Sequence, residues 1–144
     1  MFDFHLHSRV SFDSTEAPCE IIRAAERNGL REICFTDHID YGNPYCYCCD
    51  VVNYQKDIMN FQNKYKNKIN IKFGMEFGAQ AHHKDYFQNI FNKYDFDFIL
   101  LSFHLINDKD LWDRSFQKGK TQAQFNRQYY EEIYKSVQIY NNYR

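Results

Sequence analysis

The chain has 144 residues, a length that suits one domain better than two. Hydrophobic residues make up 44% of it and charged residues 26%, so a buried core is possible and general disorder is not expected. Its 18 basic and 19 acidic residues nearly cancel, which argues against a nucleic-acid-binding module with a basic surface.

The first half of the chain alternates strand-like and helix-like segments. Residues 2–6 are typical of a short strand, and residues 14–18 are expected to open a helix, because Ser or Thr can cap it and Pro is tolerated in its first turn. Gly29 is expected to end this helix. A second strand is predicted at 32–36, and residues 51–66 have the apolar spacing of an amphipathic helix.

The second half repeats this alternation. Strands are predicted at 69–77 and 96–103, and helices at 82–94 and 121–140. The Phe-Ile-Leu-Leu run of the fourth strand suggests burial on both faces. The last helix is expected to contribute to the core through Phe125, Tyr129, Ile133 and Val137. Four consecutive βα units favour parallel strands with right-handed crossovers, and therefore an α/β fold that is half of a barrel or a small open sheet.

Each predicted strand ends on histidine or glutamate. In chain order these residues are His5 and His7, His38, Glu76, and His104. The carboxyl ends of parallel strands meet at one face, where active sites of such folds lie, so we expect these side chains to converge. A single histidine would be better explained by a structural hydrogen bond, but the coincidence at four strand ends indicates a functional site.

The residue types at these ends suit metal binding. Imidazole and carboxylate groups are ligands for zinc, iron or manganese. Alternate residues of a strand point the same way, so His5 and His7 can bind one ion together. A lone carboxylate such as Glu76 can bridge two ions, which can then activate a water and stabilise the leaving oxygen of a phosphoryl displacement. The pattern therefore predicts metal-assisted hydrolysis of a phosphate ester.

At these positions the sequence resembles the PHP family (polymerase and histidinol phosphatase), in its histidinol-phosphatase branch. The motifs that carry the resemblance are Asp3-Phe4-His5-Leu6-His7-Ser8, Phe35-Thr36-Asp37-His38, Gly74-Met75-Glu76-Phe77-Gly78 and Ser102-Phe103-His104. Two later segments also resemble that branch, Lys118-Gly119-Lys120-Thr121 and Tyr129-Tyr130-Glu131-Glu132-Ile133. The resemblance implies that the parallel βα units form the first half of a distorted (β/α)7 barrel.

The resemblance also implies a site for up to three divalent transition-metal ions, which would be zinc, manganese or iron. The implied ligands are His5, His7 and Glu76 for the first ion, Glu76 and His104 for the second, and Asp13 and His38 for the third. Glu76 and His38 would also be the catalytic residues, and a metal-bound water or hydroxide would attack phosphorus. Asp3 and Asp37 would orient imidazole rings.

The expected function is that of a hydrolase, a phosphomonoesterase similar to the histidinol-phosphate phosphatases of histidine biosynthesis, with a small phosphate ester as substrate. The alternatives are another phosphoesterase of the family, nucleotide-specific or nuclease-like, and a non-catalytic metal-binding fragment. The family has further ligands downstream, and no histidine follows His104. We therefore expect residues 1–144 to be a single PHP domain truncated at its C-terminal side, with exposed surface that invites self-association.

Weaker signals leave alternatives open. No stretch has the length of a membrane span and no secretory signal is visible, so a cytoplasmic protein with reduced thiols and no membrane partner is expected. Cys46-Tyr47-Cys48-Cys49 is either a zinc or redox motif or a loop with exposed thiols. His82 and His83 either line a substrate pocket or are solvated, and Asp40 and Tyr41 either face the site or belong to a loop.

Overall fold

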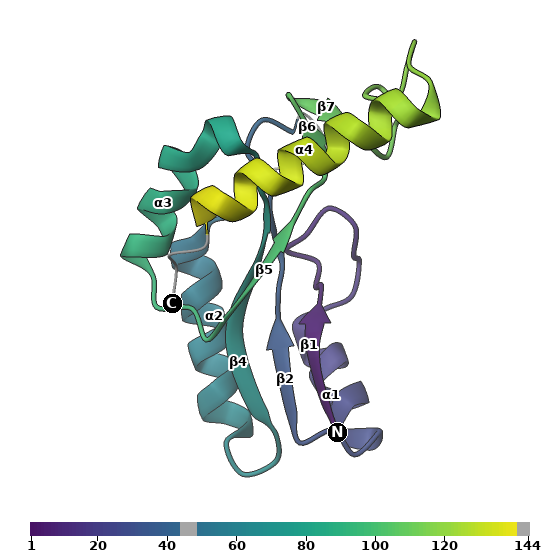
Figure 1. Ribbon diagram of the computed structural model, residues 1–144. Coiled ribbons are helices and arrows are strands. Elements are labelled where there is room, and N and C mark those ends of the chain that lie inside the picture. Colours follow the sequence, from purple (N-terminus) through teal and green to yellow (C-terminus); the bar gives the residue numbers. More distant parts are fainter. Residues whose placement is uncertain (44–48, 141–144) are drawn as a thin grey trace.

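The computed structural model describes residues 1–43 and 49–140. Its main sheet has five strands, β1 (Phe2–Leu6), β2 (Glu32–Phe35), β3 (His38–Ile39), β4 (Asn70–Gly78) and β5 (Phe98–Ser102). All pairings in it are parallel, with β4 between β5 on one side and β2 and β3 on the other, and β1 paired with β2 (Figure 1). β2 and β3 keep one register along β4, so β3 prolongs the line of β2. The predicted parallel α/β half-barrel is confirmed.

The described residues also form four α-helices and one 3-10 turn, of which all but the last helix lie between strands: α1 (Pro18–Arg27), α2 (Val51–Tyr65), η1 (Ala81–His83), α3 (Lys84–Lys93) and α4 (Gln122–Tyr140). Figure 1 shows α1 and α2 behind the sheet and α4 crossing its upper end. Ala17 is the N-cap of α1 and gives no side-chain cap, so the expected Ser or Thr cap is wrong. Gly29, with a φ of 71°, follows the end of α1 as predicted. None of the described helices is long and apolar enough to cross a membrane.

The core lies between the helices and the sheet, and aromatic rings make up much of it. Tyr54 and Ile58, at helical spacing on α2, are buried as predicted. Near the upper end of β4, the ring of Phe77 packs edge-on against Phe87 and Phe91, with centroid distances of 5.6 and 4.5 Å. Edge-to-face pairs of this kind contribute about 0.5–1.5 kcal/mol each beyond the burial of their area. The aromatic content of the chain is thus used to hold α3 against the strand that carries the site.

The prediction that the fourth strand is buried on both faces is wrong. All five residues of β5 are only half-buried. Among the described strands β5 pairs with β4 alone, so its other edge has no strand beside it. Its run of apolar side chains therefore lies at the border of the sheet and not at the centre.

The predicted core face of the last helix is also wrong in part. Val137 is exposed, whereas Glu132, Ser136 and Tyr140 are buried. The Glu132 carboxylate accepts a hydrogen bond from the first backbone N–H of η1 at 2.8 Å. The Tyr140 hydroxyl donates to the carbonyl of Gln80, the residue before η1, at 3.0 Å. These polar contacts turn the Glu132–Tyr140 side of α4 inward.

A short antiparallel hairpin, β6 (Leu105–Ile106) and β7 (Lys109–Asp110), follows β5 and was not predicted. Its two turn residues, Asn107 and Asp108, have φ angles of 51° and 58°. Two positive φ values are typical of the tight turn that suits the twist of a hairpin. The hairpin matters for function because the residues that follow it reach the candidate site.

Candidate metal centre

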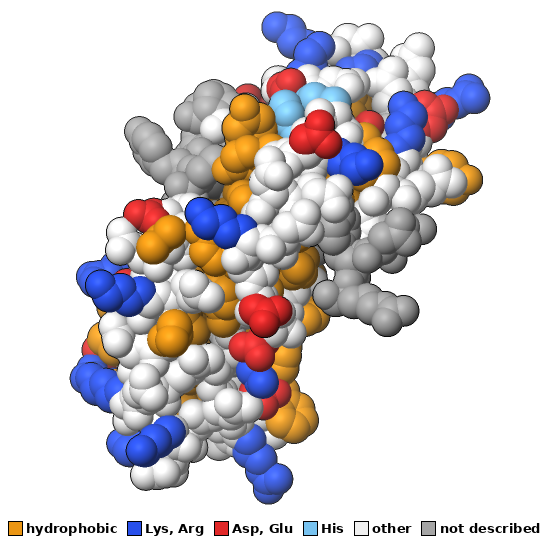
Figure 2. Space-filling model, turned by 90° about the vertical axis from the view of Figure 1, so that its left-hand side faces the viewer, with side chains coloured by type: hydrophobic (Ala, Val, Ile, Leu, Met, Phe, Trp, Pro, Cys, Tyr) orange, Lys and Arg blue, Asp and Glu red, His pale blue; other side chains and the backbone are white. Residues whose placement is uncertain are grey.

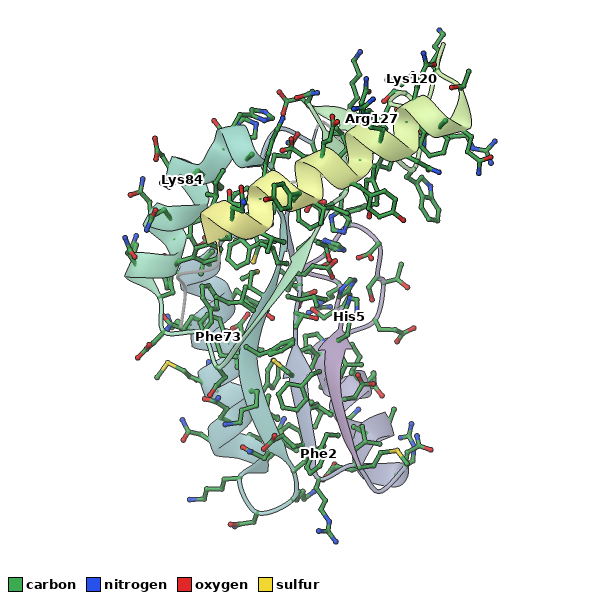
Figure 3. All side chains as sticks on the ribbon, in the orientation of Figure 1. Phe2, His5, Phe73, Lys84, Lys120 and Arg127 are labelled. Carbon is green, nitrogen blue, oxygen red and sulfur yellow. The ribbon has the colours of Figure 1, made fainter. Side chains whose placement is uncertain are left out.

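The strand ends bring the predicted ligands together at the upper end of the sheet. His5 lies on β1 and His38 on β3, while Glu76 lies on β4 with His38 as its direct partner in the parallel pairing. His7 follows the end of β1 and His104 follows the end of β5. Figure 3 shows His5 at this end of β1, with its ring among the polar side-chain atoms between the strand ends.

Glu76 is the centre of the group. Its side chain is buried, and its Oε2 lies 2.8 Å from Nε2 of His5 and 2.8 Å from Nε2 of His7. Its other oxygen, Oε1, lies 3.0 Å from Nε2 of His104. The two oxygens of one carboxylate therefore face two different sets of imidazole nitrogens.

These separations fit metal coordination. Zinc–nitrogen and zinc–oxygen distances of about 2.0–2.2 Å in a tetrahedral site place neighbouring donor atoms of one ion roughly 3.4 Å apart, slightly more than the separations seen here. The donors of His5, His7 and Glu76 form one group that could hold an ion. The imidazole nitrogens already face the Glu76 carboxylate, so small displacements of these side chains would let them bind an ion. The residues present therefore fit a divalent metal ion.

Asp13 joins the group from the loop between β1 and α1. Its Oδ2 lies 2.8 Å from Nδ1 of His7 and 3.3 Å from Nε2 of His38. These three residues form a second group that could hold an ion. The structure therefore brings together all six residues that the sequence analysis assigned to metal binding.

Asp40 is a buried carboxylate of the site that the sequence analysis left undecided. Its oxygens accept hydrogen bonds from Nδ1 of His104 at 2.9 and 3.0 Å, so that the other ring nitrogen of His104 faces Glu76. Gly78 makes room for this pair, because a Cβ added there would lie 2.0 Å from Oδ1 of Asp40 and 3.1 Å from Nδ1 of His104. His38, Asp40 and His104 form a third group that could hold an ion.

The two aspartates that were expected to orient imidazoles have other partners. Asp37 is buried and accepts hydrogen bonds from the backbone N–H and hydroxyl of Ser8 and from the hydroxyl of Ser11. The Ser11 oxygen in turn accepts from the backbone N–H of His38 at 2.8 Å. Asp3 accepts a hydrogen bond from the backbone N–H of its neighbour at 3.2 Å. Asp37 thus fixes the loop that leads to the ligand positions and contacts no described imidazole by a hydrogen bond.

Hydrogen bonds within the group shift the pKa values of its members. Burial alone would lower the pKa of His7, but hydrogen bonds to Glu76 and Asp13 raise it from 6.5 to about 9. Burial is likewise outweighed at His104, where hydrogen bonds to Asp40 and Glu76 raise the pKa to about 10. Against its burial, the same contacts hold the pKa of Glu76 well below its ordinary value. Without metal the group is charged, and a metal ion would replace the protons on the nitrogens that face Glu76.

These residues lie in an open cavity of about 960 Å³. Phe12, Trp112, Asp110 and Asp113 line the same cavity and were missed by the sequence analysis. Asp110 ends the unpredicted hairpin, and Trp112 and Asp113 follow it, which explains why no motif indicated them. Among the described residues, His82 and His83 do not line it. Cys46 and Cys48 lie outside the described residues, so their motif is not placed.

Comparisons with known proteins agree with this geometry. The profile of the PHP domain family matches residues 3–141. A histidinol-phosphatase of Lactococcus lactis is 35% identical over 145 residues, a match that covers 98% of this chain and 53% of the relative. A probable histidinol-phosphatase of Clostridium acetobutylicum is 32% identical over 133 residues, which covers 91% of this chain and 50% of the relative.

A solved structure of a histidinol phosphate phosphatase also matches the chain. The crystal structure of histidinol phosphate phosphatase from Lactococcus lactis, complexed with zinc, L-histidinol and phosphate, matches with a TM-score of 0.90 and 34% identity. That match covers 99% of this chain and 55% of the other. The chain therefore spans about half the length of the curated relatives it matches.

Proposed function

The chain belongs to the PHP domain family, and we propose that it is the metal-binding half of a phosphomonoesterase that hydrolyses histidinol phosphate or a closely similar ester. The observation that carries the proposal is Glu76, whose two oxygens face different histidines in an open cavity. A carboxylate in this position is what two neighbouring ions require of a bridging ligand. The likeness to histidinol-phosphatases supports the substrate class.

We assign the donors to ions as the family resemblance suggests. The proposed ligands are His5, His7 and Glu76 for the first ion, Glu76 and His104 for the second, and Asp13 and His38 for the third. When bound, divalent ions here supply Lewis-acid polarisation of the phosphate and lower the pKa of a nearby water. Zinc is the first candidate because the relative's crystal structure contains it, and manganese and iron suit the same donors. Glu76 and His38 are proposed to lie closest to the reacting groups.

Other residues of the chain hold these donors in place. Asp40 accepts from Nδ1 of His104 and thereby fixes which ring nitrogen is offered to the site. Ser11, itself held by Asp37, fixes the backbone at His38. Such outer contacts keep the donor atoms in position while substrate and product exchange in the open cavity.

The rim of the cavity favours a substrate that has a cationic end. Asp110 and Asp113 place negative charge there, and Phe12 and Trp112 add aromatic surface. Negative charge around a cleft attracts cations and repels polyanions. Histidinol phosphate carries an ammonium group and an imidazole ring, so it suits this rim better than a nucleic acid does.

We further propose that residues 1–144 bind metal but turn over substrate near background. The chain spans about half the length of its relatives, and the family resemblance implies further ligands and basic phosphate-binding residues in the remaining half. Ions that lack part of their ligand set bind more weakly, and the transition state loses charge stabilisation, which is usually the largest contribution to catalysis.

Phosphate release tests these proposals together. The substrates are histidinol phosphate, an aryl phosphate and a nucleoside monophosphate, each with zinc, manganese or ferrous ion. Two proteins are compared, residues 1–144 alone and a chimera in which the second half of the Lactococcus lactis relative follows Arg144. The chimera should hydrolyse histidinol phosphate fastest, and His5→Ala/His7→Ala should abolish this activity.

Each other outcome contradicts a distinct part of the proposal. A preference for the nucleotide would refute the substrate class. Equal turnover by the short chain and the chimera would refute the need for a second half. A chimera that folds and binds metal but hydrolyses none of the three esters would make the chain a metal-binding fragment without catalytic function.

A further inference from the structure

A second group of potential metal ligands lies away from the Glu76 centre. It consists of His82 and His83 on η1 and Asp108 in the β6–β7 turn. Nε2 of His83 lies 2.9 Å from Oδ1 of Asp108, and Nε2 of His82 lies 3.2 Å from the same oxygen. One donor atom from each of the three residues lies within 4.8 Å of the other two. Figure 2 shows histidine side chains at the surface beside acidic ones on the side of the molecule where α2 and α3 lie.

The side chains of His82 and His83 point toward each other, although adjacent residues of a turn would be expected to point apart. Consecutive residues of a 3-10 turn point about 120° apart, so neighbouring side chains normally diverge. Here the rings of His82 and His83 are 4.0 Å apart between centroids, and both turn toward one carboxylate. Two protonated imidazoles so close together would repel each other, whereas a single metal ion can bind both through their neutral nitrogens.

Asp108 is held in place by hydrogen bonds to Gln80. Its carboxylate accepts a hydrogen bond from the side-chain amide of Gln80 at 3.0 Å, and its backbone N–H donates to the amide oxygen of Gln80 at 2.9 Å. Gln80 is fully buried, and its carbonyl accepts from the hydroxyl of Tyr140 on α4. The Asp108 carboxylate thus lies within hydrogen-bonding distance of three nitrogens, and Nε2 of His82 is 3.2 Å from each of its two oxygens.

Gly42 leaves the space that the group needs. A Cβ at this position would lie 3.0 Å from Oδ1 of Asp108 and 3.3 Å from Nε2 of His83. Gly42 also has a φ of 87°, a conformation that other residues rarely adopt. A backbone without a side chain therefore passes directly beside the donor atoms.

We propose that His82, His83 and Asp108 form a separate zinc site that ties the β6–β7 hairpin to the start of α3. Two imidazoles and one carboxylate are donors that zinc prefers, and three protein ligands leave a fourth position for water. The site uses none of the residues assigned to the Glu76 centre. Because Asp110 belongs to the hairpin and Trp112 and Asp113 follow it directly, zinc bound at Asp108 would fix this part of the rim of the cavity.

Zinc stoichiometry tests the site on the whole chain. Equilibrium dialysis followed by elemental analysis should find one zinc fewer per chain in His82→Ala/His83→Ala than in the parent. The matched control is Lys84→Ala/Asp85→Ala, which changes the next two residues of the same segment and should bind as many ions as the parent. Gly42→Ala removes no ligand but fills the space beside two of them, and it should lose the same ion as the double histidine variant.

Two further measurements locate the ion. Zinc should shift the side-chain ¹⁵N resonances of His82 and His83, and it should do so also in His5→Ala/His7→Ala, in which the first ligand pair of the Glu76 centre is missing. Trp112 is the single tryptophan of the chain, so its fluorescence reports on the rim. Part of the zinc-induced change in emission should be lost in His82→Ala/His83→Ala.

The site would be overturned if the folded His82→Ala/His83→Ala variant bound as many zinc ions as the parent and zinc did not shift the His82 and His83 resonances of the parent. The three residues would then be a hydrogen-bonded surface cluster. Resonances that shift without any zinc-dependent difference in Trp112 emission between parent and variant would overturn the proposed fixing of the rim.

Discussion

Glu76→Gln is the substitution that most directly tests the bridging role. In the parent, Oε2 faces His5 and His7 at 2.8 Å, and Oε1 faces His104 at 3.0 Å. A glutamine offers one acceptor oxygen and an amide nitrogen that has no lone pair for a metal. Whichever way the amide turns, one of the two sets of imidazoles faces the NH2 group. The variant should therefore bind about one ion fewer, and not merely bind the same ions more weakly.

The same substitution has a second consequence in the metal-free protein. The carboxylate of Glu76 is buried and is a partner of several imidazoles, so its loss leaves the half-buried nitrogens of His7 and His104 without this acceptor. Such losses cost about 1–3 kcal/mol. Urea unfolding in the presence of a chelator should show a decrease in the free energy of unfolding of this size.

The assay is a zinc titration with bound metal counted per folded chain. Glu16→Gln, at an exposed position just before α1, is the matched control and should leave both the ion count and the stability unchanged. If Glu76→Gln binds as many ions as the parent at saturation, Glu76 is not a bridge, and the reasoning from its two oxygens is wrong.

Three further outcomes follow from the geometry. Asp40→Asn should weaken metal binding by about 10–100-fold, because His104 loses the partner that orients its ring. Asp95→Asn, at an exposed position, is the control and should leave the affinity for metal unchanged. Isothermal titration measures both affinities. Gly78→Ala should destabilise the fold by at least about 1–3 kcal/mol in urea unfolding, because its Cβ would overlap the Asp40 carboxylate. The pKa values of His7 and His104 are raised from 6.5 to about 9 and 10, so their contribution to metal-free stability is complete below pH 6.5 and is lost as pH rises through 9–10. The urea midpoint in chelator should fall across that window, and it should fall less in Glu76→Gln.

The ligand positions could be predicted because they depend on short-range patterns. A strand followed by a helix places its last residues at one edge of a parallel sheet, whatever the rest of the chain does. His5 and Glu76 therefore needed only the recognition of β1 and β4. The family resemblance then added Asp13, which lies on a loop and has no periodicity of its own.

The role of Asp40 could not be predicted in this way. Its contact with His104 joins residues 64 positions apart in the chain, and it depends on the missing side chain at Gly78. The hairpin after β5 was missed because each of its strands has two residues, too few for an alternating pattern to be visible. The inward face of α4 was misjudged because it is set by hydrogen bonds and not by hydrophobicity: Glu132 accepts one from the backbone N–H of Ala81, and Tyr140 donates one to the carbonyl of Gln80.

Gly78 links the identity of one position to that of another. The residue that its backbone admits depends on how far the side chain at position 40 reaches, since a Cβ at 78 would lie 2.0 Å from Oδ1 of Asp40. A larger residue at 78 becomes tolerable only together with a smaller one at 40, and that exchange removes the acceptor for His104. Functional relatives should therefore keep both residues together, and substitutions at either position should be rare in any library selected for metal binding.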